Sequence, residues 1–347
     1  MKEVLGVGAG RTGTLNELLT RIIGAERSAQ LFKMLVVHPA LASAQGPGVS
    51  RALAAQVLNM LLFEDLVARV PAAQDYVKDR LDRGGRVTHD HGAVRTVALA
   101  GMGALPAGEE GLIRVLRPLG YARREVYPLD KLKMTGRSYA QQDYPEDIAQ
   151  FFVSELHPDR FSPEFQSAVI RVTASSQDPL TPPAKSALVV LERDGSIALD
   201  TAVAVLPVLA GCFDRQHAIP SVADYAALAA ESAEMAWIST EGNAFNHATD
   251  RVADVETVAR EQKALGRPMK DAIEISASGR IRQTAFRAAT VRRQFRQADG
   301  APVEREVPGS FYEFISRGAL PDGSGKLDLG FDSSNAQGIF KMTERVA

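Results

Sequence analysis

The sequence has almost no cysteine, nearly balanced charge and no long uninterrupted apolar run. Its single cysteine, Cys212, excludes an internal disulfide and a cysteine-based zinc site, and it fits a reducing compartment. Forty basic residues against 42 acidic residues leave a formal net charge of −2. That balance gives no reason to expect nucleic acid or an anionic membrane surface as a partner.

We expect no export or membrane segment. The N-terminal residues lack the basic-then-apolar pattern of a signal peptide. The most apolar region, residues 197–213, is interrupted by Asp200 and Pro207 and is too short to span a bilayer. Of the 347 residues, 45% are hydrophobic and 24% are charged, which is typical of a globular protein with a sizeable core. We therefore expect a cytoplasmic protein.

Hydrophobic periodicity predicts helices in the first quarter of the chain. Residues 15–35 carry apolar side chains at three- and four-residue spacing, and residues 50–70 do the same and are apolar enough to be buried. A third helix is expected at about 72–83, before a Gly-Gly pair. Residues 1–85 are therefore predicted to be a helical N-terminal part.

From residue 87 onward the sequence predicts a β-α-β-β-β pattern twice, separated by a helical insert at about 160–240. Asp254 suits the N-cap of the second copy's helix, expected at 255–265. The whole chain, 1–347, is expected to form a single domain, with the sheet in residues 86–347. The predicted strands are 87–97, 149–156, 243–252 and 309–317, with further extended stretches at 121–129, 136–142, 271–277 and 283–296.

The spacing of polar residues supports this repeat. The first strand of each copy carries a histidine, and the last strand carries a glutamate. The two are 64 residues apart in the first copy (His91 and Glu155) and 66 in the second (His247 and Glu313). This predicts an α+β fold in which two copies of one supersecondary unit face each other across a shared cavity.

The stretch GAGRTG, residues 8–13, matches the G-x-G-x-x-G pattern of dinucleotide-binding loops. Such a site needs a strand, a helix and a second strand that ends in an acidic residue about 20 positions later. Here the helix is followed by MLVVHPAL, which does not end in an acid, and then by more helix. The sequence therefore gives little support to dinucleotide binding.

The stretch VTHDHGAVRTV, residues 87–97, places unusual groups on one face of a predicted strand. Alternate side chains of a strand share a face, so this face would combine imidazole and guanidinium groups with small apolar ones. The residues expected on that face are Val87, His89, His91, Ala93, Arg95 and Val97.

Two histidines and one glutamate have the composition of a metal site. His91 and His247 lie on the first strands of the two copies, and Glu313 lies among aromatic and aliphatic residues in SFYEFI, where an unpaired carboxylate would be costly. Two histidines and one carboxylate make the facial triad of mononuclear non-haem iron(II) sites, which leaves positions open for substrate and dioxygen. The alternative is a structural salt bridge between Glu313 and Arg317 or Arg251.

Arg95 is a candidate for substrate binding. It lies four residues beyond His91, roughly 13 Å along the strand at about 3.3 Å per residue. An acid that chelates a metal at one end could reach this guanidinium with a second carboxylate, which arginine binds bidentately. The alternative is an arginine at a strand edge in solvent.

At these residues the sequence resembles a known family. The resemblance is to the DUF1338 family, whose characterised members are 2-oxoadipate dioxygenase/decarboxylases, also named hydroxyglutarate synthases. It covers roughly residues 30 to 345. The stretches that carry it are DHGAVRTV (90–97), FFVSEL (151–156), FNHATDRV (245–252), VPGSFYEFISRG (307–318) and FDSSNAQGIFKMT (331–343).

The resemblance implies a fold, a cofactor and a reaction. The fold would be similar to the vicinal-oxygen-chelate (glyoxalase-like) arrangement of paired βαβββ units, curved around the metal. Fe(2+) would be bound by three ligands, and Arg95 would contact the substrate and fix which carbon faces the oxidant. Ser334 and Asn335 would also touch substrate, whereas Glu155 is not implied to be a ligand and is expected to be structural or to support the site. The metal ligands implied by the resemblance are His91, His247 and Glu313.

The implied reaction converts the 2-oxo dicarboxylic acid 2-oxoadipate and O2 to 2-hydroxyglutarate and CO2. Two rivals stay open at this stage. One is a redox-neutral, glyoxalase-like lyase or isomerase that works with another metal. The other is a non-catalytic protein that binds small acids. The sequence does not indicate an oligomeric state.

Overall fold

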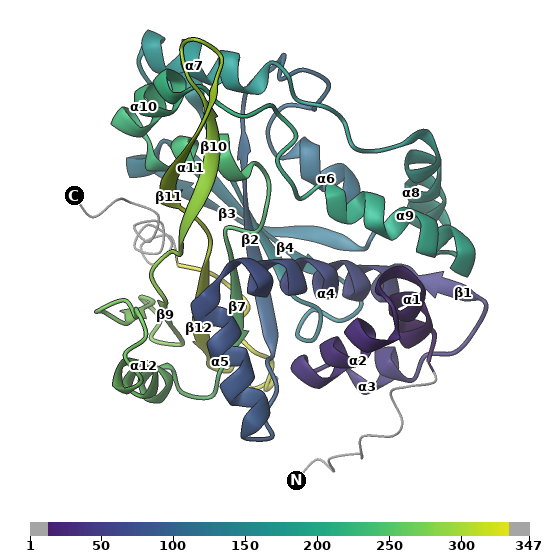
Figure 1. The fold of residues 1–347 in the computed structure, drawn as a ribbon. Helices are drawn as coiled ribbons and strands as arrows, with labels where there is room; N and C mark the ends of the chain where they lie inside the picture. Colours follow the sequence, from purple (N-terminus) through teal and green to yellow (C-terminus); the bar gives the residue numbers. More distant parts are fainter. Residues whose placement is uncertain (1–12, 333–347) are drawn as a thin grey trace.

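A curled eight-stranded sheet forms the centre of the protein, in a computed structural model that describes residues 13–332 (Figure 1). Its strands are β2 (His89–Val97), β3 (Tyr121–Leu129), β4 (Met134–Gln141), β5 (Gln150–Leu156), β7 (His247–Arg251), β8 (Glu274–Ile275), β9 (Ile281–Ala285) and β12 (Phe311–Arg317). Their order across the sheet is β3-β4-β5-β2-β7-β12-β9-β8. The central strands β2 and β7 are antiparallel, and each has a parallel neighbour on its outer side, β5 or β12.

The sheet consists of two halves with the same topology. In each half a first strand (β2 or β7) is followed by a helix, α6 (Glu110–Leu116) or α12 (Val255–Ala264), and then by three more sheet strands. Asp254 caps α12 as expected, because its side chain accepts a hydrogen bond from the backbone N–H of Glu256 (3.1 Å). The predicted α+β class with two βαβββ units is confirmed.

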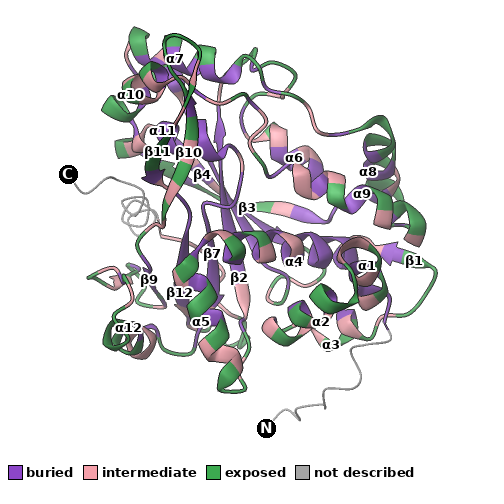
Figure 2. Ribbon diagram, viewed as in Figure 1, coloured by how far each residue is buried: buried purple, intermediate pink, exposed green. Residues whose placement is uncertain are grey.

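One face of the sheet packs against the N-terminal helices. The helix α4 (Arg51–Arg69) lies across this face, beside α5 (Pro71–Asp82). Its apolar side chains form one buried cluster with the strand side chains that point toward it, such as Val94, Phe151 and Val153. Figure 2 shows that the central strands of the sheet and the helix surfaces that face them are buried, whereas the outer helix surfaces are exposed. The shorter helices of this part are α1 (Thr14–Ile23), α2 (Ala25–Met34) and α3 (Pro39–Ala42).

The helices of the insert, which lie in two places, are α7 (Pro163–Thr173), α8 (Pro182–Asp194), α9 (Leu199–Gly211), α10 (Val222–Glu231) and α11 (Ala233–Glu241). Helices α7, α10 and α11 form a second apolar cluster with the other face of the sheet, where Phe152 and Leu156 meet Trp237. Helices α8 and α9 pack near the N-terminal helices, where the short strands β1 (Gly48–Ser50) and β6 (Ser196–Ala198) pair.

A separate hairpin interrupts the second half. Within the described residues, the strands β10 (Thr290–Arg296) and β11 (Pro302–Pro308) form a two-stranded sheet of their own and project from the main sheet toward α10 (Figure 1). Phe295 holds the hairpin against Tyr225, with ring centroids 4.9 Å apart. The single extended stretch predicted at 283–296 is therefore two strands, and only the first belongs to the main sheet.

Two local predictions are wrong. The helix expected at 15–35 is two helices, because Gly24 adopts φ 88° and interrupts the helical backbone between α1 and α2. The expected face of β2 is also broken, because the register of β2 on β7 shifts between His89 and His91. Asp90 is the extra residue at this bulge, and the His89 ring packs against Phe63 of α4 (centroids 5.0 Å apart), away from His91.

Other expectations remain as they were. Among residues 13–332, no helix combines the length and the apolar character needed to cross a membrane. The single-domain organisation and the cytoplasmic location stay predictions. The GAGRTG stretch lies, apart from Gly13, outside the described residues.

Candidate metal centre

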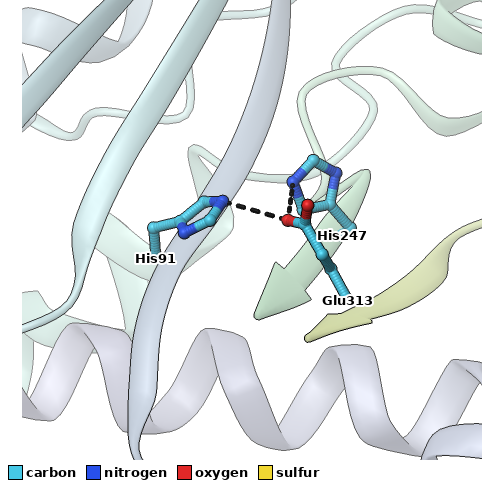
Figure 3. A group of neighbouring side chains, drawn as sticks. All are labelled: His91, His247 and Glu313. Atoms are coloured by element: carbon cyan, nitrogen blue, oxygen red, sulfur yellow. Dashed lines mark ion pairs between the residues drawn. The ribbon is translucent and has the colours of Figure 1, made fainter. Parts of the chain in front are cut away.

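The three side chains predicted as metal ligands converge on one point (Figure 3). Glu313 Oε2 lies 3.2 Å from the Nε2 atoms of both His91 and His247. One potential ligand atom from each residue falls within 4.8 Å of the others, and all three residues are buried. The three groups come from β2, β7 and β12, so the tertiary fold brings them together.

Strand register explains this convergence. In the antiparallel β2–β7 pair, Gly92 lies opposite Ala248, so His91 and His247 each precede one member of this pair. In the parallel β7–β12 pair, His247 lies opposite Phe311, which places Glu313 two residues further along on the same face. Gly92 is required here, because a Cβ atom at this position would come within 2.2 Å of the Phe245 ring.

Hydrogen bonds fix the orientation of the ligands. His91 Nδ1 lies 2.8 Å from Asp90 Oδ1, so Asp90 accepts a hydrogen bond from Nδ1 and fixes the ring with Nε2 turned toward Glu313. Thr249 donates from its hydroxyl to Glu313 Oε2 (2.7 Å). The His247 ring packs against Phe311, with centroids 4.7 Å apart. The donors are thus held in place by neighbouring side chains.

The electrostatics of the site favour an ionised Glu313 carboxylate beside a neutral His247 imidazole. Burial alone would raise the pKa of Glu313, but His247 and His91 together lower it below its ordinary value. Burial lowers the pKa of His247. The pKa of His91 is raised, because its hydrogen bonds to Asp90 and Glu313 outweigh burial, which lowers it. A carboxylate oxygen and two imidazole nitrogens on one side of a buried point are the donor set of a 2-His-1-carboxylate site.

The alternative salt bridge for Glu313 is not formed. Arg317 instead binds Asp90, with Nη2 2.8 Å from Oδ1, and Arg251 Nη1 lies 3.8 Å from Asp90 Oδ2. Burial would raise the pKa of Asp90, but Arg317 and His91 lower it, so that carboxyl also stays ionised. Sequence reasoning did not identify Asp90 as part of the site, although its position next to His91 in the sequence was the available signal.

Glu155 does not correspond to Glu313. It lies opposite Thr96 in the β2–β5 pair, which places it on the face away from the triad. There it accepts hydrogen bonds from the Glu109 N–H (2.8 Å) and from Arg137 Nη1 (3.2 Å). The equivalence suggested by the 64- and 66-residue spacings is therefore wrong, because insertions between the strands make equal counts coincidental. Glu155 has a structural environment.

A small pocket adjoins the triad. Apolar side chains form much of its wall, and Arg95 lies in it on the same strand face as His91. The residues that line it are Ala93, Arg95, Phe152, Ser154, Asn246, His247, Gln283, Glu313, Phe331 and Asp332.

Arg95 is buried, which excludes the alternative of an arginine at a strand edge in solvent. Its side chain is 1% exposed, and Nη2 lies 2.5 Å from Glu234 Oε2. The guanidinium carbon lies 4.8 Å from the centroid of the Trp237 ring. Glu234 and Trp237 of α11 were not predicted from the sequence, where an acid within the apolar stretch AEMAWI was the available signal. Ser334 and Asn335, the other predicted substrate contacts, lie outside the described residues.

Comparison with known proteins places the chain in a family. The family model for 2-oxoadipate dioxygenase/decarboxylase matches residues 60–337, which is most of the chain. The chain belongs to the 2-oxoadipate dioxygenase/decarboxylase family. The resemblance inferred from the motifs is thereby confirmed, and so is the expectation of an enzyme family. A search of curated proteins found no significant match.

Solved structures similar to this chain share its fold. A protein from Ralstonia eutropha JMP134, provisionally assigned to the glyoxalase superfamily, is 53% identical, with a TM-score of 0.88 over 92% of this chain and 98% of its own. Hydroxyglutarate synthase from Oryza sativa, in complex with 2-oxoadipate, is 20% identical, with a TM-score of 0.63 over 83% and 91%. The Pseudomonas putida enzyme with the same ligand is 19% identical, with a TM-score of 0.54 over 86% and 74%. The last two show a shared fold.

Proposed function

We propose that the protein is an iron(II)-dependent dioxygenase that decarboxylates a 2-oxo dicarboxylic acid, with 2-oxoadipate as the substrate. One molecule of 2-oxoadipate and one of O2 would give one of 2-hydroxyglutarate and one of CO2, so that both oxygen atoms enter the products. The observation that carries the proposal is the convergence of three buried donors beside a pocket that contains an arginine, in a chain of this family.

The triad fits Fe(2+) by the chemistry of its donors. His91, His247 and Glu313 would hold the ion, and three protein ligands leave coordination positions free. The bound metal would supply the affinity for dioxygen and the redox chemistry, which the side chains themselves cannot provide. Asp90 and Thr249 would keep two of the ligands oriented, through the hydrogen bonds already present.

The rest of the pocket would bind and orient the substrate. Arg95 would receive the carboxylate remote from the 2-oxo group, and the ion pair with Glu234 would keep its guanidinium from turning away. Phe152 and Phe331 would exclude water from the reacting end. Ser334 and Asn335, implied by the resemblance, are also proposed as substrate contacts.

The proposal is tested by oxygen consumption. Metal-free protein reconstituted with Fe(2+) is mixed with 2-oxoadipate under air, and O2 uptake, CO2 release and 2-hydroxyglutarate are measured together. We expect equal amounts of all three. Reconstitution with Zn(2+) should give none. Turnover without O2 uptake would instead indicate a redox-neutral lyase or isomerase, and binding without turnover would indicate an acid-binding protein.

A panel of acids tests the substrate class. Two 2-oxo dicarboxylic acids of different length and 2-oxohexanoic acid, which lacks the second carboxylate, are compared by kcat/KM. If Arg95 binds the remote carboxylate, the dicarboxylic acids should be preferred and 2-oxoadipate should be the best of them. Equal kcat/KM for 2-oxohexanoic acid would contradict this part of the proposal.

A further inference from the structure

One buried arginine, Arg317, connects the predicted metal ligand His91 to one wall of the pocket. Asp90, which accepts the hydrogen bond from His91 Nδ1, is bound by Arg317 through Nε (2.9 Å to Oδ2) and Nη2 (2.8 Å to Oδ1). The Arg317 side chain is 0% exposed and that of Asp90 is 1% exposed. A buried pair of this geometry fixes the carboxylate closely, and through it the ring of His91.

The remaining nitrogen of the same guanidinium holds the segment 328–331. Arg317 Nη1 donates to the carbonyl oxygens of Asp328 (2.9 Å) and Gly330 (2.7 Å). The guanidinium carbon also lies 5.1 Å from the centroid of the Phe331 ring. Arg317 therefore uses one edge of its planar group for Asp90 and the other for the main chain of this segment, which a lysine could not do.

Phe331 connects this segment to the pocket. Its ring lies edge-on to His91, with centroids 4.8 Å apart, and packs against Phe152, with centroids 5.1 Å apart. Phe331 and Phe152 both line the pocket, as does Glu313. The backbone N–H of Phe331 donates to the Tyr127 hydroxyl (3.1 Å). The position of Phe331 thus depends on the Arg317 guanidinium, which lies against the Phe331 ring and holds the carbonyl groups of Asp328 and Gly330.

We propose that Arg317 is a positioning residue that couples the orientation of His91 to the packing of residues 328–331 over the pocket. Metal binding at His91 and closure of this wall are then linked, and linkage is reciprocal: a bound metal stabilises the wall, and a packed wall strengthens metal binding. This inference rests on the proposed metal site and adds a residue that the family resemblance did not single out.

Arg280 provides a matched control. Its Nε donates to Asp328 Oδ2 (2.8 Å), so it holds the same segment, but among the contacts found in residues 13–332 it has none with Asp90 or the triad. Arg280→Met should therefore loosen the segment without disconnecting it from His91. Arg317→Met removes both connections.

The test uses Co(2+), which reports binding without turnover. Metal-free wild type, Arg317→Met and Arg280→Met are titrated with Co(2+), followed by its visible absorption. We expect Arg317→Met to bind Co(2+) about 10-fold or more weakly than wild type, with a changed absorption spectrum, and Arg280→Met to bind it within about 2-fold. Hydrogen exchange is then measured in peptides that contain residues 328–331. Co(2+) should slow exchange there in wild type and Arg280→Met, but not in Arg317→Met.

A second variant separates coupling from stability. Arg317→Lys keeps a positive charge beside Asp90 but cannot join that carboxylate to two carbonyl groups. It should bind Co(2+) more tightly than Arg317→Met and still lose the metal-induced protection of residues 328–331. Equal protection in wild type and both Arg317 variants, or none in wild type that binds Co(2+), would overturn the coupling while the metal site stands. Failure of wild type to bind Co(2+) would reject the metal site itself, and the coupling with it.

Discussion

Phe152 and Glu313 occupy equivalent positions in the two halves of the sheet. His91 lies opposite Gln150 on β5, and His247 lies opposite Phe311 on β12; Phe152 and Glu313 each follow two residues later. Where the second half supplies a carboxylate, the first half supplies an apolar ring that lines the pocket. The duplicated framework therefore offers three donors where full symmetry would offer four, and the missing donor would leave an open side on the proposed metal.

The first prediction follows from this asymmetry. Phe152→Glu should add a fourth donor, so that Co(2+) binds at least as tightly as in wild type while O2 uptake with 2-oxoadipate is mostly lost. Phe152→Leu, which keeps an apolar wall, should retain activity and serves as the control. Oxygen-electrode traces and Co(2+) titrations provide the measurement. Full activity in Phe152→Glu would mean that the open side does not face this ring.

The second prediction concerns the triad. Replacing His91, His247 or Glu313 by alanine should raise the dissociation constant for Co(2+) by more than about 100-fold and abolish O2 uptake. The matched control is Glu155→Gln. It changes another glutamate, which lies on the face of the sheet away from the triad, and should leave the Co(2+) affinity unchanged. Metal titration by calorimetry measures both. Normal binding by His247→Ala would refute the site.

The third prediction concerns Arg95. Arg95→Met should keep Co(2+) binding, while kcat/KM for 2-oxoadipate relative to 2-oxohexanoic acid should fall roughly 10- to 100-fold, the value of a charge-assisted hydrogen bond. The variant should also lose about 3 kcal/mol of unfolding free energy, because Glu234 would remain buried without its cation. Arg95→Met combined with Glu234→Gln should recover part of that stability but not the substrate preference.

The fourth prediction concerns pH and Asp250. Asp250 accepts hydrogen bonds from the Tyr76 hydroxyl (2.6 Å) and the Thr88 N–H (2.9 Å), but burial outweighs them and raises the pKa of Asp250 to about 6. The folded protein therefore binds this proton more tightly than the unfolded chain does. The resulting stability is fully present below about pH 4 and is lost as the pH rises through about 6.

Asp250→Asn removes this titration. Between pH 4 and pH 8, the unfolding free energy of the variant should rise relative to wild type by about 2 to 3 kcal/mol. Urea unfolding at several pH values measures the difference. Tyr76→Phe, which removes a donor that lowers the pKa of Asp250, should make the pH-dependent loss larger. Curves for wild type and Asp250→Asn that run parallel across this range would contradict the assignment.

Much of the fold and of the triad could be predicted from local patterns. His91 and His247 stand out because they occupy the first strands of two similar units, and Glu313 because it is an acid among apolar neighbours. The α12 cap at Asp254 is a local signal as well. Each of these depends on residues close in sequence, and the family motifs join them.

The remaining features depend on register between distant strands. Alternation along β2 predicted one face for His89 and His91, but the bulge at Asp90 turns His89 toward α4. Counting residues paired Glu155 with Glu313, whereas strand pairing assigns Phe152 to that position. The partners Glu234 and Arg317 come from segments far along the chain from Arg95 and Asp90, so no local pattern could have joined them.

The antiparallel contact between β2 and β7 is where the two halves of the sheet meet. His91 belongs to one half, and His247 and Glu313 belong to the other, so an ion bound by all three would act as a cross-link over this seam. The loaded protein would then melt as one cooperative unit, whereas chelation would leave the halves joined by backbone pairing, side-chain packing and polar contacts such as the Asp90–Arg317 ion pair. An isolated half would carry too few donors to retain the ion.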